Sequence, residues 1–165
     1  MKNDTITTLE GNAPVSKDAH IAVVASRFNE LIVEQLLSGA LATLTKHGVE
    51  TGRVVVVRVP GAWELPIVCR QLAKSGKVHG IVALGCVIRG GTPHFDYVAG
   101  EAARGLAAAS LETGVPIGLG VLTTNTLEQA LERVDETKVG HRGVDAALAT
   151  LHMVALREAL RLAGY

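Results

Sequence analysis

One stretch of the sequence, RGGTPHFDY (89–97), places two glycines, a threonine and a histidine directly after the apolar run GIVALG. His94 lies between a Gly-Gly-Thr turn and a predicted helix start, where free backbone N–H groups and the helix dipole favour an anion. A histidine beside a bound phosphate is well placed to move protons near neutral pH. Residue types alone do not decide between a functional and a purely structural loop. Gly90 and Gly91 could serve only the turn, and His94 could be a capping or surface residue.

Two further apolar runs are followed by residues that could bind a ligand. Phe28 follows the first run and could stack on a heterocycle. Trp63 follows the second, and residue type favours a buried core position for it. Its neighbour Glu64 could accept hydrogen bonds from ligand hydroxyls, or could merely stabilise its own helix start as an acid in the first turn.

One cysteine and two arginines complete the candidates from residue type. Cys86 has no evident basic partner to activate its thiol, so a backbone contribution is favoured over a nucleophilic one. Arg133 ends a short predicted helix and could hold a phosphate in bidentate fashion. For an isolated arginine, however, a solvated helix face is the favoured account, and Arg142 carries the same ambiguity.

Four apolar runs must position these residues, and they cover 20–26, 54–59, 80–85 and 116–122. They are continuous rather than alternating, which is typical of strands covered on both faces. Helices are predicted over 30–47, 63–75 and 96–113, each followed by a glycine that can end it. A capping box at Asn125 and Glu128 predicts a short helix reaching about Val134, and a last helix covers about 144–163.

Strands that alternate with helices predict an α/β fold, a three-layer α/β/α sandwich with a four-stranded parallel sheet of the flavodoxin-like type. In such sheets ligands bind outside the carboxyl ends of the strands, where the loops 26–30, 60–64, 85–97 and 123–128 converge. We predict one domain over 20–165. Residues 1–19 are either a tail or an added strand through TITTL (5–9).

Composition excludes several classes of protein. The chain of 165 residues balances 16 basic against 16 acidic residues without a basic run, so nucleic acid is not an expected partner. The polar start and the lack of a long apolar segment predict a cytoplasmic protein with no membrane partner. The two cysteines are expected to be free thiols.

Several chemical signatures are also missing from the sequence. It contains no GxxxxGK[ST], no GxSxG and no HExxH, and its six histidines are not spaced as metal ligands. The string that begins at Gly118 departs from GxGxxG and lies within a predicted strand. A dinucleotide cofactor and a metal are therefore not expected.

Five blocks carry a resemblance to a known family: ASRFNE (25–30), VPGAWELP (59–66), ALGCVIRGGTPHFDYV (83–98), GVLTTNTLEQALER (120–133) and GHRG (140–143). Together they resemble the 6,7-dimethyl-8-ribityllumazine synthase family of transferases. The resemblance implies condensation of 5-amino-6-(D-ribitylamino)uracil with 3,4-dihydroxy-2-butanone 4-phosphate, the penultimate step of riboflavin biosynthesis. It implies small-molecule substrates and no cofactor.

The resemblance also implies a role for each matching residue. His94 becomes the proton-transfer residue, and Arg133 becomes a phosphate ligand rather than a solvated side chain. The residues implied for the pyrimidine substrate are Phe28, Asn29, Ala62, Trp63, Glu64, Cys86, Val87, Ile88 and Leu119. Those implied for the butanone phosphate are Gly91, Thr92, Arg133 and Arg142.

In the family, the positions of Leu119 and Arg133 belong to a neighbouring subunit. The resemblance therefore implies a homopentamer, sometimes with twelve pentamers in a hollow icosahedral shell. The alanine-rich 100–112 and the apolar last helix fit burial against other subunits, although ordinary core packing explains them equally well.

Three features depart from the family pattern. Many relatives have phenylalanine at the position of Leu119 and lysine at that of Arg142, and the segment VDETKVGH (134–141) is one residue longer than the common pattern, in a turn that influences contacts between pentamers. Two other hypotheses stay open, a binding module that retains riboflavin or a lumazine, and a cage-forming protein whose chemistry is secondary.

Overall fold

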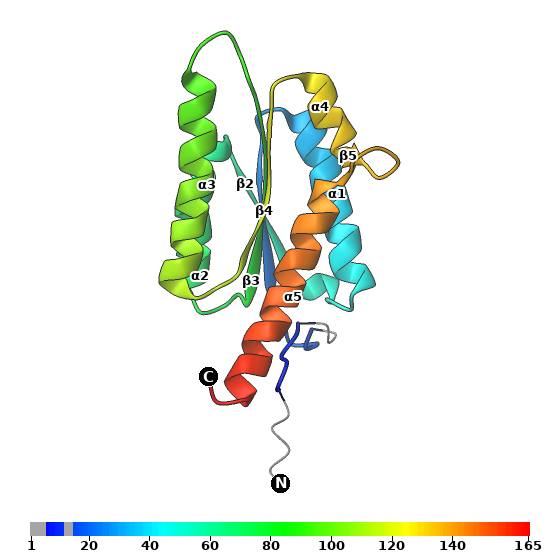
Figure 1. Ribbon diagram of the computed structural model, residues 1–165, viewed down its shortest axis with the longest axis vertical. Coiled ribbons are helices and arrows are strands. Elements are labelled where there is room, and N and C mark those ends of the chain that lie inside the picture. Colours follow the sequence, from blue (N-terminus) through cyan, green and yellow to red (C-terminus); the bar gives the residue numbers. More distant parts are fainter. Residues whose placement is uncertain (1–5, 12–14) are drawn as a thin grey trace.

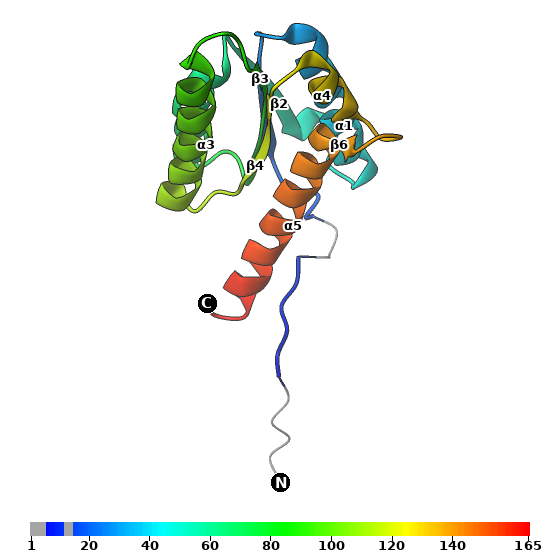
Figure 2. The same cartoon turned by 45° about the horizontal axis from the view of Figure 1, so that its top comes forward.

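Helices pack on both faces of a parallel sheet in the computed structural model, which describes residues 6–11 and 15–165. Figure 1 shows α1 (Glu30–Lys46) and α5 (Arg142–Leu162) on one face, and α2 (Leu65–Lys74) and α3 (His94–Thr113) on the other. Figure 2 shows the same three layers from another angle. The predicted three-layer α/β/α sandwich is confirmed.

The sheet contains four parallel strands in the order β2-β1-β3-β4. They are β1 (Ile21–Ser26), β2 (Val54–Val59), β3 (Gly80–Ile88) and β4 (Ile117–Thr124). Over the described residues, this matches the first four strands of the flavodoxin-like order. Because β3 extends past the predicted end at 85, the backbone of Cys86, Val87 and Ile88 is strand rather than loop.

Burial differs between the inner and outer strands. Every residue of β1 is buried, and alternate side chains enter two cores, since Ile21 and Val23 face α1 and α5 while Ala22 and Val24 face α2 and α3. The outer strands are less covered, and Val55 on β2 and Leu119 on β4 are exposed. The prediction of strands covered on both faces is therefore right for β1 and most of β3 and wrong for β2 and β4, which lie at the sheet edges.

The helix ends agree with the sequence signals, but four helix starts differ. The helix expected from 63 begins at Leu65, and the helix expected from about 144 begins at Arg142. Gly48, Gly76 and Gly114 follow α1, α2 and α3 with positive φ, as expected of terminating glycines. The helix expected from 96 begins at His94. For α4 (Leu127–Glu132) the capping residue is Thr126 rather than Asn125, because the Thr126 hydroxyl accepts a hydrogen bond from the backbone N–H of Gln129 at 3.2 Å.

Shorter elements complete the chain. The 3₁₀ turns η1 (Thr51–Arg53) and η2 (Ala62–Glu64) flank β2. An antiparallel pair, β5 (Val134–Asp135) and β6 (Gly140–His141), connects α4 to α5 and was not predicted. This pair lies within the segment VDETKVGH (134–141). No strand is found within 6–9 of TITTL, and Thr5 lies outside the described residues.

Close contacts at two glycines bring α5 against the rest of the fold. A Cβ on Gly118 would lie 2.3 Å from the carbonyl oxygen of Ala146, so glycine allows α5 to lie directly on β4. A Cβ on Gly143 would lie 2.2 Å from the carbonyl oxygen of Leu36, so α5 also touches the backbone of α1. Among the described residues, no helix combines the length and apolar character needed to span a membrane.

Candidate active site

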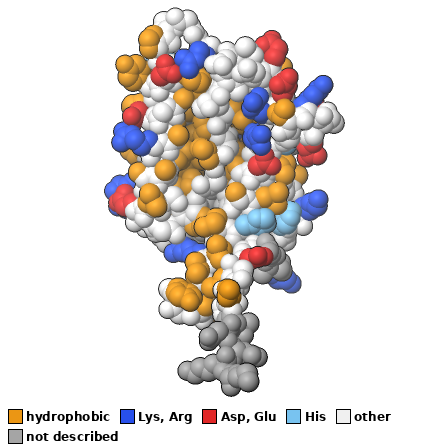
Figure 3. All heavy atoms as spheres, in the orientation of Figure 1, with side chains coloured by type: hydrophobic (Ala, Val, Ile, Leu, Met, Phe, Trp, Pro, Cys, Tyr) orange, Lys and Arg blue, Asp and Glu red, His pale blue; other side chains and the backbone are white. Residues whose placement is uncertain are grey.

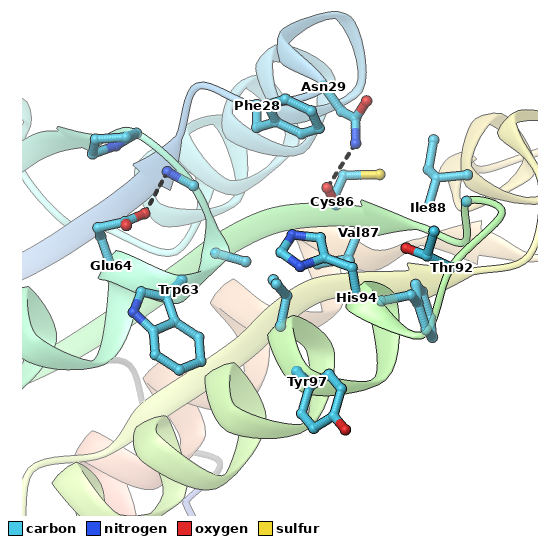
Figure 4. Close-up of a pocket in the computed structure, with 16 residues that line it drawn as sticks. Phe28, Asn29, Trp63, Glu64, Cys86, Val87, Ile88, Thr92, His94 and Tyr97 are labelled. Atoms are coloured by element: carbon cyan, nitrogen blue, oxygen red, sulfur yellow. Dashed lines mark hydrogen bonds between the residues drawn. The ribbon is translucent and has the colours of Figure 1, made fainter.

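A cavity of about 800 Å³ opens at the carboxyl ends of β1, β2 and β3, where the sequence predicts a ligand site. Figure 4 shows its labelled side chains, which come from the loop after β1, from η2, from the end of β3 and from the start of α3. The lining residues are Phe28, Asn29, Pro60, Gly61, Ala62, Trp63, Glu64, Cys86, Val87, Ile88, Gly90, Thr92, His94, Phe95, Tyr97 and Val98.

The loop after β1 forms one wall. The backbone N–H of Phe28 donates to the carbonyl of Pro60 at 3.0 Å, which ties this loop to the one after β2. The Phe28 ring is 72% exposed, so it offers an aromatic face to a ligand. Asn29 has a left-handed backbone with φ of 56°, and its amide Nδ2 donates to the carbonyl of Cys86 at 2.8 Å.

The second wall is η2. The Trp63 side chain is 57% exposed, so the expectation of a buried core position is wrong; Leu65 and Cys69, which follow on the same segment, enter the core instead. Glu64 Oε2 accepts a hydrogen bond from the backbone N–H of Gly61 at 2.9 Å, which fixes the carboxylate at the cavity wall. Its other oxygen remains available to a ligand hydroxyl.

The end of β3 provides a strand backbone along the cavity. Cys86 is buried, and burial raises the pKa of its thiol to about 11, so the thiol stays protonated near neutral pH. This supports a backbone contribution from Cys86 rather than nucleophilic chemistry. Val87 and Ile88 are half-buried and continue the same wall.

The loop between β3 and α3 leads into His94. Neither Gly90 nor Gly91 has a left-handed φ, and a Cβ on either would meet nothing within 4 Å. Folding of the chain therefore does not require glycine at these positions, whereas close approach of an anion to the backbone would. His94 is exposed as the first residue of α3, and both His94 and Thr92 line the cavity.

Four predicted residues lie outside this cavity. Leu119 is exposed on the edge strand β4. Arg133 is the C-terminal capping residue of α4, and its Nη1 donates to the carbonyl of Gln129 at 2.8 Å. Arg142 opens α5, pairs with Asp145 at 2.7 Å, and its backbone N–H donates to the carbonyl of Arg133 at 2.8 Å. The two arginines are thus adjacent. Gly91 is not part of the lining either, although both of its neighbours are.

Sequence reasoning did not single out several lining residues. Tyr97 is 69% exposed and lies one helical turn after His94, and this i, i+3 spacing could have indicated that the two share a face of α3. Pro60 and Gly61 contribute through the backbone, and residue type gives no signal for such contacts. Phe95 and Val98 line the cavity from α3.

A parallel α/β/α sandwich with a largely apolar cavity at the carboxyl ends of its strands, edged by a carboxylate, a histidine and a glycine loop, defines a small-molecule enzyme of the flavodoxin-like class. The model of the 6,7-dimethyl-8-ribityllumazine synthase family matches residues 18–158. The chain belongs to this family, which confirms the resemblance and the prediction of an enzyme.

Curated relatives agree over nearly the whole chain. The chain is similar to the 6,7-dimethyl-8-ribityllumazine synthase of Nitratidesulfovibrio vulgaris (strain DSM 19637 / Miyazaki F), with 53% identity over 94% of this chain and 98% of the relative. It is also similar to the protein of that name from Desulfovibrio desulfuricans, with 50% identity over 94% of this chain and 99% of the relative.

Proposed function

We propose that the chain condenses 5-amino-6-(D-ribitylamino)uracil with 3,4-dihydroxy-2-butanone 4-phosphate to give 6,7-dimethyl-8-ribityllumazine, phosphate and water. The amine forms an imine with the ketone and releases water. Phosphate is then eliminated, and ring closure with loss of a second water yields the lumazine. One observation carries the proposal: a single cavity joins an exposed aromatic ring, a fixed carboxylate and a glycine loop next to a histidine.

The pyrimidine substrate is assigned to the wall formed by β1, η2 and β3. Phe28 stacks on the ring, and the backbone of Cys86, Val87 and Ile88 bonds its polar edge. Glu64 accepts hydrogen bonds from the ribityl hydroxyls while Gly61 holds its other oxygen. The carbonyl of Cys86 is already oriented by Asn29, and Ala62 and Trp63 hold the ring and the ribityl chain.

The second substrate is assigned to the loop and to the start of α3. Gly91 and Thr92 hold the phosphate, and the amino end of this helix favours the negative charge. His94, as the first helical residue, moves protons for the imine and elimination steps. No metal or cofactor takes part in this proposal.

The remaining substrate-binding residues come from a second copy of the chain. Leu119 and Arg133 lie outside the cavity of their own subunit, so a site that uses them is completed by a neighbour, with Arg142 close to Arg133. Exposed apolar residues support such an assembly. Figure 3 shows hydrophobic side chains along the middle of one face and at its lower end. Leu119, Met153 and Leu162 are among the large hydrophobic residues that are exposed in the single subunit. We propose a homopentamer, which could associate further into a shell of twelve pentamers.

The proposed reaction is tested by incubating the purified protein with both substrates and following lumazine absorbance. We expect formation well above the spontaneous rate, and no increase over that rate would defeat the proposal. Tight binding of riboflavin with no turnover would favour the binding-module hypothesis instead.

The shared site is tested by complementation. At a butanone phosphate concentration well below the raised KM of Arg133→Ala, the His94→Ala and Arg133→Ala variants should each be nearly inactive alone, because each lacks one half of every site. Co-expression in equal amounts should restore about a quarter of the sites, since each site then draws His94 and Arg133 independently from two subunits. Sedimentation velocity on the same samples should give a pentamer or a multiple of it. Absence of any recovery, or a monomeric species, would exclude the shared site.

A further inference from the structure

The loop that leads from β3 to α3 needs an anchor that its own sequence does not provide. Gly90 and Gly91 have no side chains to pack, and a glycine pair leaves the backbone more conformational freedom than other residues do. A phosphate site and a proton-transfer residue, however, require fixed positions. The fixed points must therefore lie at the two ends of the loop.

Arg89, immediately before the glycines, contacts two separate segments, the start of α3 and the end of β4 with the residue that follows it. Its Nη2 and Nη1 donate to the two carboxylate oxygens of Asp96 in the first turn of α3, at 3.0 and 3.3 Å. Its Nε donates to Asn125 Oδ1 at 3.1 Å, beyond the end of β4. Its Cζ lies 4.2 Å from the centre of the Phe95 ring, and its backbone N–H donates to the carbonyl of Thr124 at 2.8 Å.

These contacts enclose the residues assigned to phosphate binding. The ion pair from Arg89 to Asp96 bridges the loop, so Gly91, Thr92 and His94 lie on the chain between its two ends. The planar guanidinium fork fixes the direction of the Asp96 carboxylate as well as its distance. The start of α3, which carries His94, is thereby held relative to the ends of β3 and β4.

The same pair affects the charge at the start of α3. Asp96 is the acidic residue of the first turn, at the helix end that is assigned to the phosphate. An unpaired carboxylate there would repel the substrate, and the Arg89 guanidinium offsets this negative charge.

We propose that Arg89 is a positioning residue, which holds the phosphate loop and His94 through its contacts with Asp96, Phe95 and Asn125. This inference rests on the proposed function. It acts through the loop and the helix start and need not touch the substrate. Its removal should therefore affect the phosphorylated substrate and leave the pyrimidine site in place.

The test begins with Arg89→Met, which keeps an apolar stem and removes the guanidinium. We expect KM for the butanone phosphate to rise about tenfold and KM for the pyrimidine to stay within about twofold, because hydrogen bonds between charged groups are lost on one side of the site only. Arg89→Lys keeps the charge but loses the fork, so it should recover only a small part of the loss.

Arg70 offers a matched control. Its Nε and Nη2 form a similar bidentate pair with Glu112 at 2.7 and 2.8 Å, between α2 and α3 and outside the cavity lining. Arg70→Met should leave both KM values within about twofold of the wild type. A general loss of packing of α3 would lower activity in both variants and would change both KM values.

Titration with inorganic phosphate by calorimetry separates this inference from the proposed reaction. A wild-type protein without turnover would refute the reaction. About tenfold weaker phosphate binding to Arg89→Met than to Arg70→Met would still support the positioning role of Arg89. Equal phosphate affinities, equal changes in both KM values, or full recovery with Arg89→Lys would each overturn the positioning role.

Discussion

Replacing Asn29 by alanine would remove two features that hold the loop after β1 in place. The backbone of Asn29 is left-handed, with φ of 56°, and asparagine tolerates this conformation better than alanine. The difference costs about 1 kcal/mol. The hydrogen bond from Nδ2 to the Cys86 carbonyl, at 2.8 Å and partly buried, contributes about another 1 kcal/mol. Asn29→Ala should therefore lower the free energy of unfolding by about 2 kcal/mol.

Asn29→Gly separates the two contributions. Glycine adopts a left-handed backbone without strain, so only the hydrogen bond is lost and the expected cost is about 1 kcal/mol. Urea denaturation measures both values, at one fixed protein concentration because the proposed subunit association would contribute to stability. Gln35→Ala is the control, since Gln35 is exposed on α1 and donates to the carbonyl of Leu31 one turn earlier; it should change stability by less than about 0.5 kcal/mol.

The results of this series can refute the reasoning at either step. Equal destabilisation by alanine and glycine would show that the backbone conformation contributes nothing. An Asn29→Ala protein as stable as the wild type would refute both contributions. Because Asn29 orients the Cys86 carbonyl, KM for the pyrimidine should also rise more than KM for the butanone phosphate, and the opposite order would contradict the assignment of this wall.

The remaining predictions concern the proposed proton-transfer residue, the proposed phosphate ligand and the buried thiols. His94→Ala should slow turnover by about a hundredfold or more with little change in either KM, and unchanged turnover in a steady-state assay would remove His94 from the mechanism. Arg133→Ala should raise KM for the phosphorylated substrate far more than KM for the pyrimidine; equal effects would indicate a structural arginine. Burial raises the pKa of Cys69 to about 12 and that of Cys86 to about 11, from an ordinary value of 9.0. Above about pH 9 the unfolded chain therefore loses thiol protons that the native state keeps, so the unfolding free energy should fall as pH rises through these values. A thiolate-directed reagent at about pH 8 should label both thiols slowly in the native protein and rapidly in concentrated urea, and equal rates would contradict their burial.

Hydrophobic pattern predicted the inner part of the fold well. The continuous apolar runs of β1 and β3 correspond to strands buried on both faces. The same pattern misled at the edges, because VVVVRV of β2 reads as fully buried although Val55 is exposed at a sheet edge. A strand is exposed when it lies at the edge of the sheet. The order of the strands in the sheet differs from their order along the chain, so the sequence alone does not show which strands are at the edges.

The candidate site shows a similar division. Its loops were predicted because parallel strands bring their carboxyl ends together. Trp63 was expected in the core, since tryptophan is usually well buried, but its neighbour Leu65 takes that position. The β5–β6 pair escaped prediction because two-residue strands leave no periodic signal. The hydrogen bond from Arg89 to Asn125 joins segments that are distant in sequence, so no local pattern could indicate it.

Two pairs of glycines in this chain have opposite consequences for mutagenesis. At Gly118 and Gly143 the fold itself leaves no room for a side chain, so almost any substitution should be lost from a library selected for folded, well-expressed protein. At Gly90 and Gly91 nothing surrounds the backbone, so a folding selection should accept side chains that an activity selection rejects. Selecting one library separately for folding and for activity would thus show, at each position, whether glycine is required by the fold or by the ligand.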